Sequence, residues 1–248
     1  MANPIKQFEI KPLIDLPVGD FNLAYTNSSL WMTIAIILST AFFTMAMRRK
    51  ALVPGRWQIF AETIYEFVAG MVRDNIGSKG RQYFPFIFTL FVIVLLGNML
   101  GMIPYSFTYT SHIVVTAALA LFIFGIVVLI GLAKHGFHFF SLFLPPGVPA
   151  WLIPLIIPIE VMSFLIRPLP LSVRLFANMI AGHIMLKVFA GFTVSMIGMG
   201  VGGYALGLLP VVFNSVLIGF EFLIAFLQAY VFAILSCIYL KDTVEIAH

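Results

Sequence analysis

Residues 169–186 read LPLSVRLFANMIAGHIML and place Arg174 inside a long apolar segment. Asn178 follows one helical turn later, and His183 follows nine residues after the arginine. An arginine in the hydrocarbon costs about 2.5–3.5 kcal/mol on insertion scales, so it usually faces protein or water and serves a function. The alternative is a helix-end arginine whose charged head snorkels to the interface. The long apolar sequence on both sides of Arg174 favours the functional interpretation.

The composition predicts an all-α polytopic membrane protein. Hydrophobic residues make up 61% of the 248 residues and charged residues only 10%, whereas a soluble domain is about 45–50% apolar and about 25% charged. The net charge of +4 does not indicate a nucleic-acid partner, because most cations lie between hydrophobic segments, where they set topology. The single cysteine, Cys237, cannot form an internal disulfide, and its apolar surroundings predict a small core residue.

Hydrophobic segments and their flanks predict about five crossings and one surface helix. Residues 1–20 carry charges and prolines without an apolar core, which predicts that no signal peptide is cleaved. Arg48, Arg49 and Lys50 follow the first span, which predicts the N-terminus outside and the C-terminus in the cytoplasm. The predicted segments are an outer N-terminal segment 1–27, span 28–47, an amphipathic helix 56–73, spans 84–104 and 112–133, and long tilted helices 150–190 and 205–240.

Residues 56–73 differ from the spans because their apolar residues recur at three- and four-residue steps. The stripe consists of Trp57, Phe60, Ile64, Phe67 and Met71. This pattern predicts an amphipathic helix on the cytoplasmic membrane surface. A soluble core helix would show the same period, but the neighbouring spans favour the surface.

Two shorter motifs have two interpretations each. Gly97 and Gly101, with Asn98 between them, are spaced as in closely packed membrane helices, although glycine is also common in such helices without that role. His135 and His138 are three residues apart and could ligate a metal. With no second cluster to support them, we expect interfacial residues and no metal site.

The segment 150–190 is too long for a helix perpendicular to the membrane. Its 41 residues would extend roughly 60 Å as a helix, against a hydrocarbon core of about 30 Å. Either two spans lie within it or one helix is strongly tilted. The glycine-rich stretch 198–203 then forms the turn into a second long helix, so we expect the last two long helices to form a hairpin.

Polar residues of the two long helices fall at matching levels of this hairpin. Asn214, Glu221 and Gln228 are seven residues apart, which keeps them close to one line along a helix. With the turn near residue 201, the numbers of facing residues add up to about 402. The predicted pairs are Arg174 with Gln228, His183 with Glu221, and Lys187 with Asn214, while Glu160 falls level with Asp242.

The polar groups of the first long helix occupy different faces and depths. His183 lies about 13 Å further along the axis than Arg174 and on the opposite helix face. Glu160, Ser163 and Arg167 form a third group on the inner side.

The motif 171–182, LSVRLFANMIAG, resembles the a subunit of F-type ATP synthases, as do VPGRWQ at 53–58 and GNMLGMIP at 97–104. The resemblance covers most of the chain after residue 50. It implies two long, steeply tilted helices that wrap a rotating ring of c subunits, with Arg174 as the essential arginine and Asn178 and Gln228 near it. Many bacterial members carry the acid after the arginine and the histidine in the last helix. Here the types are exchanged, as His183 and Glu221, as in mitochondrial-type members.

The resemblance also implies the function. It implies a non-catalytic, proton-translocating stator subunit of the Fo sector in the bacterial inner membrane, without a cofactor. Its expected partners are c-ring subunits, peripheral-stalk b subunits, the remainder of the synthase and the lipid bilayer. We expect an outer half-path and an inner half-path that a c-ring carboxylate connects. The outer one comprises His183, Glu221, Asn214 and Lys187, and the inner one comprises Glu160, Ser163 and Arg167.

Other classes of protein fit the sequence less well. An independent ion channel or secondary transporter would need a full ion path within one chain, and often inverted repeats. A membrane enzyme would need a nucleophile–base set or a metal cluster, and neither is evident. The residues leave sodium open as the ion, although they favour the proton.

Overall fold

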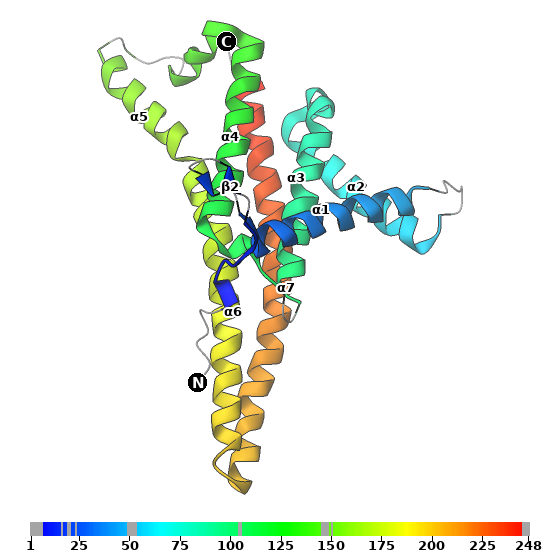
Figure 1. Ribbon diagram of the computed structural model, residues 1–248. Helices are drawn as coiled ribbons and strands as arrows, with labels where there is room; N and C mark the ends of the chain where they lie inside the picture. Colours follow the sequence, from blue (N-terminus) through cyan, green and yellow to red (C-terminus); the bar gives the residue numbers. More distant parts are fainter. Residues whose placement is uncertain are drawn as a thin grey trace. The chain divides into compact units, whose positions relative to one another are not determined.

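The computed structural model describes residues 7–15, 17–18, 21–22, 24–48, 54–103, 106–144, 149 and 151–244 (Figure 1). Arg49 and Lys50, which contribute to the predicted orientation, lie outside the described residues. The α-helices are α1 (Asn27–Ala46), α2 (Arg56–Ile76), α3 (Phe84–Gly101), α4 (Ile113–His135), α5 (Ile153–Ile166), α6 (Pro168–Ile197) and α7 (Val201–Val244). The 3₁₀ helices are η2 (Gly77–Tyr83), η3 (Tyr109–Ser111) and η4 (Gly136–Phe143).

Short strands precede the first helix, where the sequence predicts an irregular segment. Strand β1 (Pro12–Ile14) pairs antiparallel with β4 (Tyr25–Thr26), and β2 (Pro17–Val18) pairs antiparallel with β3 (Phe21–Asn22). Strands of two or three residues contribute few hydrogen bonds, so the fold rests on the helices.

The all-α membrane fold that the composition predicts is confirmed. Among the described residues, five helical stretches are long and apolar enough to cross a membrane. A helix satisfies its own backbone hydrogen bonds, which a membrane span requires because lipid offers no partners. The stretches are Asn27–Ala46, Arg56–Gly101, Ile113–Phe143, Ile153–Ile197 and Gly202–Val244.

The range 150–190, for which one helix is predicted, contains the two helices α5 and α6. They meet at Arg167, whose N–H donates to the Phe164 carbonyl at 3.3 Å in a tighter, three-residue turn. Pro168 begins α6 and has no N–H with which to continue the hydrogen bonds of α5, whereas Arg167 before it keeps helical angles of φ −48° and ψ −42°. The turn between α6 and α7 uses Gly200 at φ 92°, a left-handed conformation that suits glycine.

Contacts within the chain fall into two compact units. The first comprises Met1–Met45, Val92–Ile113 and Leu175–Ala229, and the second comprises Ala46–Phe91, Val114–Arg174 and Tyr230–His248. Fully buried side chains of the first unit include Val94, Leu175 and Met179. Those of the second include Ile123 and Phe232. In both units the described parts of α6 and α7 lie side by side, which makes the predicted hairpin (Figure 1).

Helix α2 occupies the range predicted for the surface helix but divides its apolar residues between two faces. Ala61, Val68 and Val72 are buried in the second unit. Trp57 and Phe60, the first residues of the predicted stripe, are 72% and 56% exposed. Exposed aromatic side chains on such a helix are typical of a surface that contacts lipid.

The glycines at 97 and 101 allow close contact with the segment that follows α3. A Cβ atom on Gly97 would overlap the Tyr109 hydroxyl, and one on Gly101 would lie 2.5 Å from Thr108 Cγ2. Both glycines therefore make room for side chains at the start of η3 rather than for a second helix.

Candidate functional site

His183 of α6 and Glu221 of α7 form a buried pair, as the hairpin register predicts. His183 Nδ1 lies 3.2 Å from Glu221 Oε1, and only 11% and 5% of the two side chains are exposed. Neither carboxyl oxygen is aligned in a hydrogen bond with a described residue. Gly182 permits this approach, because a Cβ atom there would lie 2.7 Å from Oε1. The pair is a titratable acid next to a titratable base, shielded from solvent.

Thr108 adds a third group that the sequence analysis does not identify. Its Oγ1 lies 2.8 Å from His183 Nε2, on the opposite side of the ring from Glu221. Thr108 is itself buried, and its hydroxyl donates to the Gly101 carbonyl at 3.0 Å. The only sequence signal for it is the polar stretch between the second and third predicted spans, which does not indicate which residue contacts the histidine.

Asn98 anchors α3 to α7 near the pair. Its side chain is fully buried, and Nδ2 donates to the Ala225 carbonyl at 3.2 Å. Ala225 lies one helical turn after Glu221 on α7. The Asn98 Oδ1 atom has no hydrogen-bond partner among the described residues. A buried amide with one free acceptor is a place where water or a moving polar group can bind.

Lys187 and Asn214 do not contact each other as predicted. Lys187 is exposed on α6, one turn after His183, and Asn214 is half-buried on α7. Among the described residues, no hydrogen bond or ion pair joins the two, and the buried Asn214 Oδ1 has no hydrogen-bond partner. The predicted pairing is therefore present for His183 and Glu221, but the predicted pair nearer the turn, Lys187 and Asn214, makes no polar contact among the described residues.

Arg174 and Asn178 of the arginine motif lie on α6, and Gln228, predicted to pair with Arg174, lies on α7. Arg174 is exposed on α6, and Asn178 is half-buried one turn later on the same helix. Gln228 is buried on α7, with 5% of its surface exposed. A buried glutamine requires hydrogen-bond partners, since burying an amide without them is costly.

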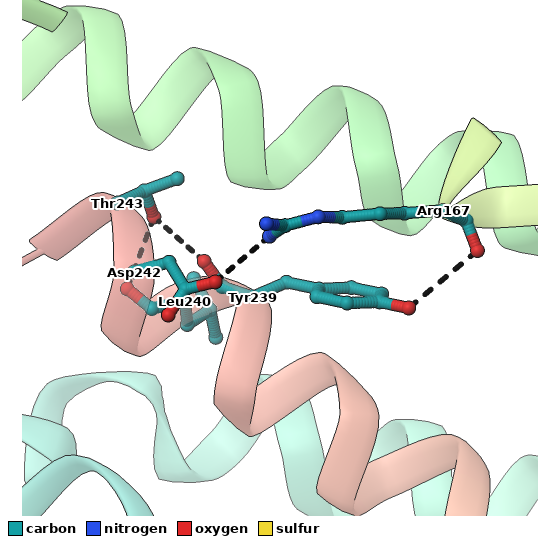
Figure 2. A network of polar contacts seen from close by, with 5 residues as sticks. All are labelled: Arg167, Tyr239, Leu240, Asp242 and Thr243. Atoms are coloured by element: carbon teal, nitrogen blue, oxygen red, sulfur yellow. Dashed lines mark hydrogen bonds and ion pairs between the residues drawn. The ribbon is translucent and has the colours of Figure 1, made fainter. Parts of the chain in front are cut away.

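Arg167 and Asp242 join the start of α6 to the end of α7 (Figure 2). Arg167 Nη1 lies 2.8 Å from Asp242 Oδ2, with 27% and 36% of the side chains exposed. The guanidinium lies 5.3 Å and 5.4 Å from the ring centroids of Phe164 and Tyr239, and the Tyr239 hydroxyl donates to the Arg167 carbonyl at 3.5 Å. The register placed Asp242 level with Glu160; in the structure the ion-pair partner of Asp242 is Arg167, another of the three predicted inner residues.

The remaining predicted inner residues lie on α5. Glu160 is half-buried and Ser163 is exposed. Within the described part of the chain, neither makes a hydrogen bond or ion pair through its side chain. Of the three predicted inner residues, Arg167 is therefore the one that has a charged partner among the described residues.

The connector after α3 contains two further titratable groups, the buried Tyr109 and the half-buried His112. Burial raises the pKa of the Tyr109 phenol and lowers the pKa of His112. The His112 ring stacks on Phe107 with centroids 5.2 Å apart. Both shifts favour the neutral form, so these two side chains add no charge to the connector.

Metal-binding groups and the cysteine are two further features of the chain that bear on chemistry. No group of three or more His, Cys, Asp or Glu that could hold a metal occurs in the ranges that the structure describes. Cys237 is fully buried with a reduced thiol, in agreement with the core role predicted for it.

Comparison with known proteins identifies the family. The family described as ATP synthase A chain matches residues 29–241. ATP synthase subunit a of Rhodospirillum rubrum is 56% identical over 245 residues, which cover 99% of each chain. The subunits a of Paramagnetospirillum magneticum and Chelativorans sp. are 54% and 53% identical over 250 and 247 residues, again over at least 99% of each chain. The chain belongs to the ATP synthase subunit a family of bacterial multi-pass membrane proteins.

Proposed function

We propose that this chain moves protons to and from the c-ring of an F-type ATP synthase through two offset half-paths. The observation that carries the proposal is the buried pair His183–Glu221 on two long apolar helices, one of which also carries Arg174. A buried acid and imidazole 3.2 Å apart can exchange a proton. The match to an ATP synthase subunit a over 99% of this chain also supports the proposal.

Arg174 separates the two half-paths in this proposal. A fixed positive charge in the membrane repels cations, so a continuous proton path past it is unfavourable. A c-ring carboxylate facing Arg174 is favoured in its charged form and releases its proton. The same carboxylate facing lipid must be neutral, because a bare carboxylate in hydrocarbon is too costly. Rotation of the ring is thereby tied to protonation.

The remaining predicted residues line the two half-paths. His183, Glu221, Asn214 and Lys187 belong to the outer one, and Asn178 and Gln228 accompany Arg174. The Oδ1 atoms of Asn98 and Asn214 have no hydrogen-bond partner in the described part of the chain. They support a wet outer path, because buried acceptors without a protein partner favour water. Glu160, Ser163 and Arg167 belong to the inner path, where all three residues are at least partly exposed.

The proposed orientation has the N-terminus outside and the C-terminus in the cytoplasm. Arg48 follows α1, and Lys134 and Lys241 lie in the last turns of α4 and α7. If the stretch Ile153–Ile197 crosses once, all three cations lie on the cytoplasmic side, as the positive-inside rule requires. Reporter fusions at both termini test this orientation. Reports from the same side would show that the stretch crosses twice.

The partners in this proposal are the c-ring, the peripheral-stalk b subunits, the remainder of the synthase and the lipid bilayer. The large exposed apolar surface of α6 and α7 supports a helical membrane partner. It includes Leu208, Leu209, Val212 and Val216, each at least 55% exposed. Copurification with many copies of a small membrane protein is the expected result.

The decisive experiment replaces Arg174. Arg174→Ala should abolish proton-driven ATP synthesis in membrane vesicles, and Arg174→Lys should also fail, because an ammonium lacks the planar guanidinium fork. Arg73→Ala, which removes an exposed cation of α2, serves as the control and should retain synthesis. Normal synthesis by the assembled Arg174→Ala complex would refute the proposed role.

A further inference from the structure

The connector between α3 and α4 places a single buried hydroxyl on the histidine of the pair. Thr108 Oγ1 lies 2.8 Å from His183 Nε2 and 3.0 Å from the Gly101 carbonyl oxygen. The connector holds Thr108 in place, because Ser111 donates to the Thr108 carbonyl from its backbone N–H at 3.1 Å and from its hydroxyl at 2.5 Å. The hydroxyl therefore has two fixed neighbours, of which the carbonyl can only accept.

The single hydrogen of the Thr108 hydroxyl decides which group donates in its hydrogen bonds to Gly101 and His183. A threonine hydroxyl carries one hydrogen, and a carbonyl oxygen accepts only. Once the Thr108 hydrogen is donated to Gly101, Oγ1 is left as an acceptor for His183. Nε2 of the histidine must then carry a hydrogen. Which ring nitrogen of a neutral histidine is protonated is set by the hydrogen bond that the other nitrogen makes.

We propose that Thr108 is a positioning residue that holds His183 in its Nε2–H form, so that Nδ1 is the atom that exchanges a proton with Glu221. This inference rests on the proposed function of the pair in proton transfer. Thr108 does not carry the proton itself. It acts through the ring, by leaving Nδ1, which lies 3.2 Å from Glu221 Oε1, without a proton in the neutral histidine.

The proton step is simple in this arrangement. A protonated Glu221 gives up its O–H bond, its oxygen keeps the electron pair, and a new N–H bond forms at Nδ1. The products are a carboxylate and an imidazolium, so the net charge of the pair is zero before and after. The Nε2–H bond to Thr108 remains in place throughout. The pair thus passes a proton without rotation of the histidine ring.

The arrangement also affects how readily the His183–Glu221 pair loses the proton that its two members share. If that proton leaves while Nε2 stays protonated, the Nδ1 lone pair faces a carboxylate, and two acceptors oppose each other. Thr108 therefore disfavours the deprotonated pair. Among the residues that the structure describes, the charged or titratable groups that act on His183 are Glu221 of α7 and Lys187, one turn along α6. The Phe8 ring lies 6.2 Å from the histidine ring.

Removal of the hydroxyl tests the inference. With Thr108→Val, the Nδ1–H form becomes available and can donate to a Glu221 carboxylate, which stabilises the deprotonated pair. Passive proton conduction through the assembled membrane sector should fall about three- to tenfold, the equivalent of one hydrogen bond. The alkaline limb of its pH profile should move to lower pH. Thr108→Ser keeps the hydroxyl and should restore both the rate and the profile.

The chain offers a matched control in the same connector. Thr110 is buried like Thr108, but its hydroxyl has no hydrogen-bond partner among the described residues. Thr110→Val should leave the pH profile unchanged. In a His183→Ala background, Thr108→Val should have no further effect on conduction, because its action passes through the ring. A wild-type profile for an assembled Thr108→Val complex would overturn the inference.

A spectroscopic readout separates this inference from the proposed function. Nitrogen-15 NMR of histidine-labelled complex, with His183 assigned from the His183→Ala variant, reports which ring nitrogen is protonated. We expect Nε2–H in the wild-type and Thr108→Ser complexes. A neutral ring protonated at Nδ1 in the wild type would refute the inference even if Thr108→Val fails to assemble. Failure of the proposed function would appear elsewhere, as proton conduction insensitive to His183→Ala, with the same NMR result.

Discussion

Among the described residues, two ion pairs link α7 to α6 or to the residue directly before it, and the two pairs differ in burial. His183 and Glu221 are 11% and 5% exposed, whereas Arg167 and Asp242 are 27% and 36% exposed. An arginine stays protonated at all relevant pH values, so the Arg167–Asp242 pair cannot transfer a proton from its cation. A histidine side chain, in contrast, can both accept and release a proton. The same helices therefore carry one pair suited to proton exchange and one suited to holding helix ends together.

The difference shows why burial alone does not make a pair stabilising. Taking an acid and a base out of water costs free energy that their attraction often fails to recover. A buried pair is therefore poor support for a structural role and better support for a functional one. A partly exposed pair such as Arg167–Asp242 contributes only about 0–1 kcal/mol. We expect substitutions in the two pairs to affect different measurements.

The largest expected effect follows from removal of one member of the buried pair. Glu221→Leu or His183→Leu should lower proton-driven ATP synthesis by about 10²-fold or more, the usual contribution of a positioned proton-transfer group. The yield of assembled complex should remain near that of the wild type. Turnover per complex in vesicles is the measurement. A loss of yield with unchanged turnover would mean that the pair only ties the helices together.

Exchange of the two residues sharpens the same comparison. The double variant His183→Glu with Glu221→His restores one acid and one imidazole at the same level of the hairpin. It should recover more ATP synthesis than the weaker of the two single exchanges. The test is a double-mutant cycle over a range of pH, with wild type, both single exchanges and the double exchange. Strictly additive losses would show that the two residues act separately.

A smaller effect is expected from displacement of the carboxyl group. Gly182→Ala adds a Cβ atom 2.7 Å from Glu221 Oε1, so the carboxyl group must move away from His183. We expect turnover to fall about tenfold, since misplacement by about 1 Å can cost up to about 10²-fold. Gly191→Ala on the same helix meets no atom within 4 Å and should keep turnover. Equal losses in the two variants would contradict a local effect on Glu221.

The smallest effect is expected at the exposed pair. Asp242→Asn removes the charge with little change in shape and should lower the stability of the complex by no more than about 1 kcal/mol. A cycle with Arg167→Gln should give a coupling energy of the same size, and salt should reduce it. Thermal inactivation of the complex measures both. A salt-independent coupling of several kcal/mol would show that this pair behaves as a buried one.

The sequence by itself determined the helical membrane fold, the hairpin and the level at which His183 meets Glu221. Apolar run length and the helical repeat are properties of a local stretch, and a tight glycine turn fixes how two adjacent helices align. The same reasoning missed the break at Arg167, because an arginine–proline step in an apolar segment is compatible with a kinked helix as well as with two helices.

Only the tertiary structure showed that Thr108 contacts His183. The two residues are 75 positions apart, and the connector that carries Thr108 has no repeat from which its register could be read. Its position depends on the close approach of the connector to Gly97 and Gly101, where a Cβ atom would not fit. Contacts of this kind arise from the packing of non-adjacent segments, which local sequence patterns do not encode.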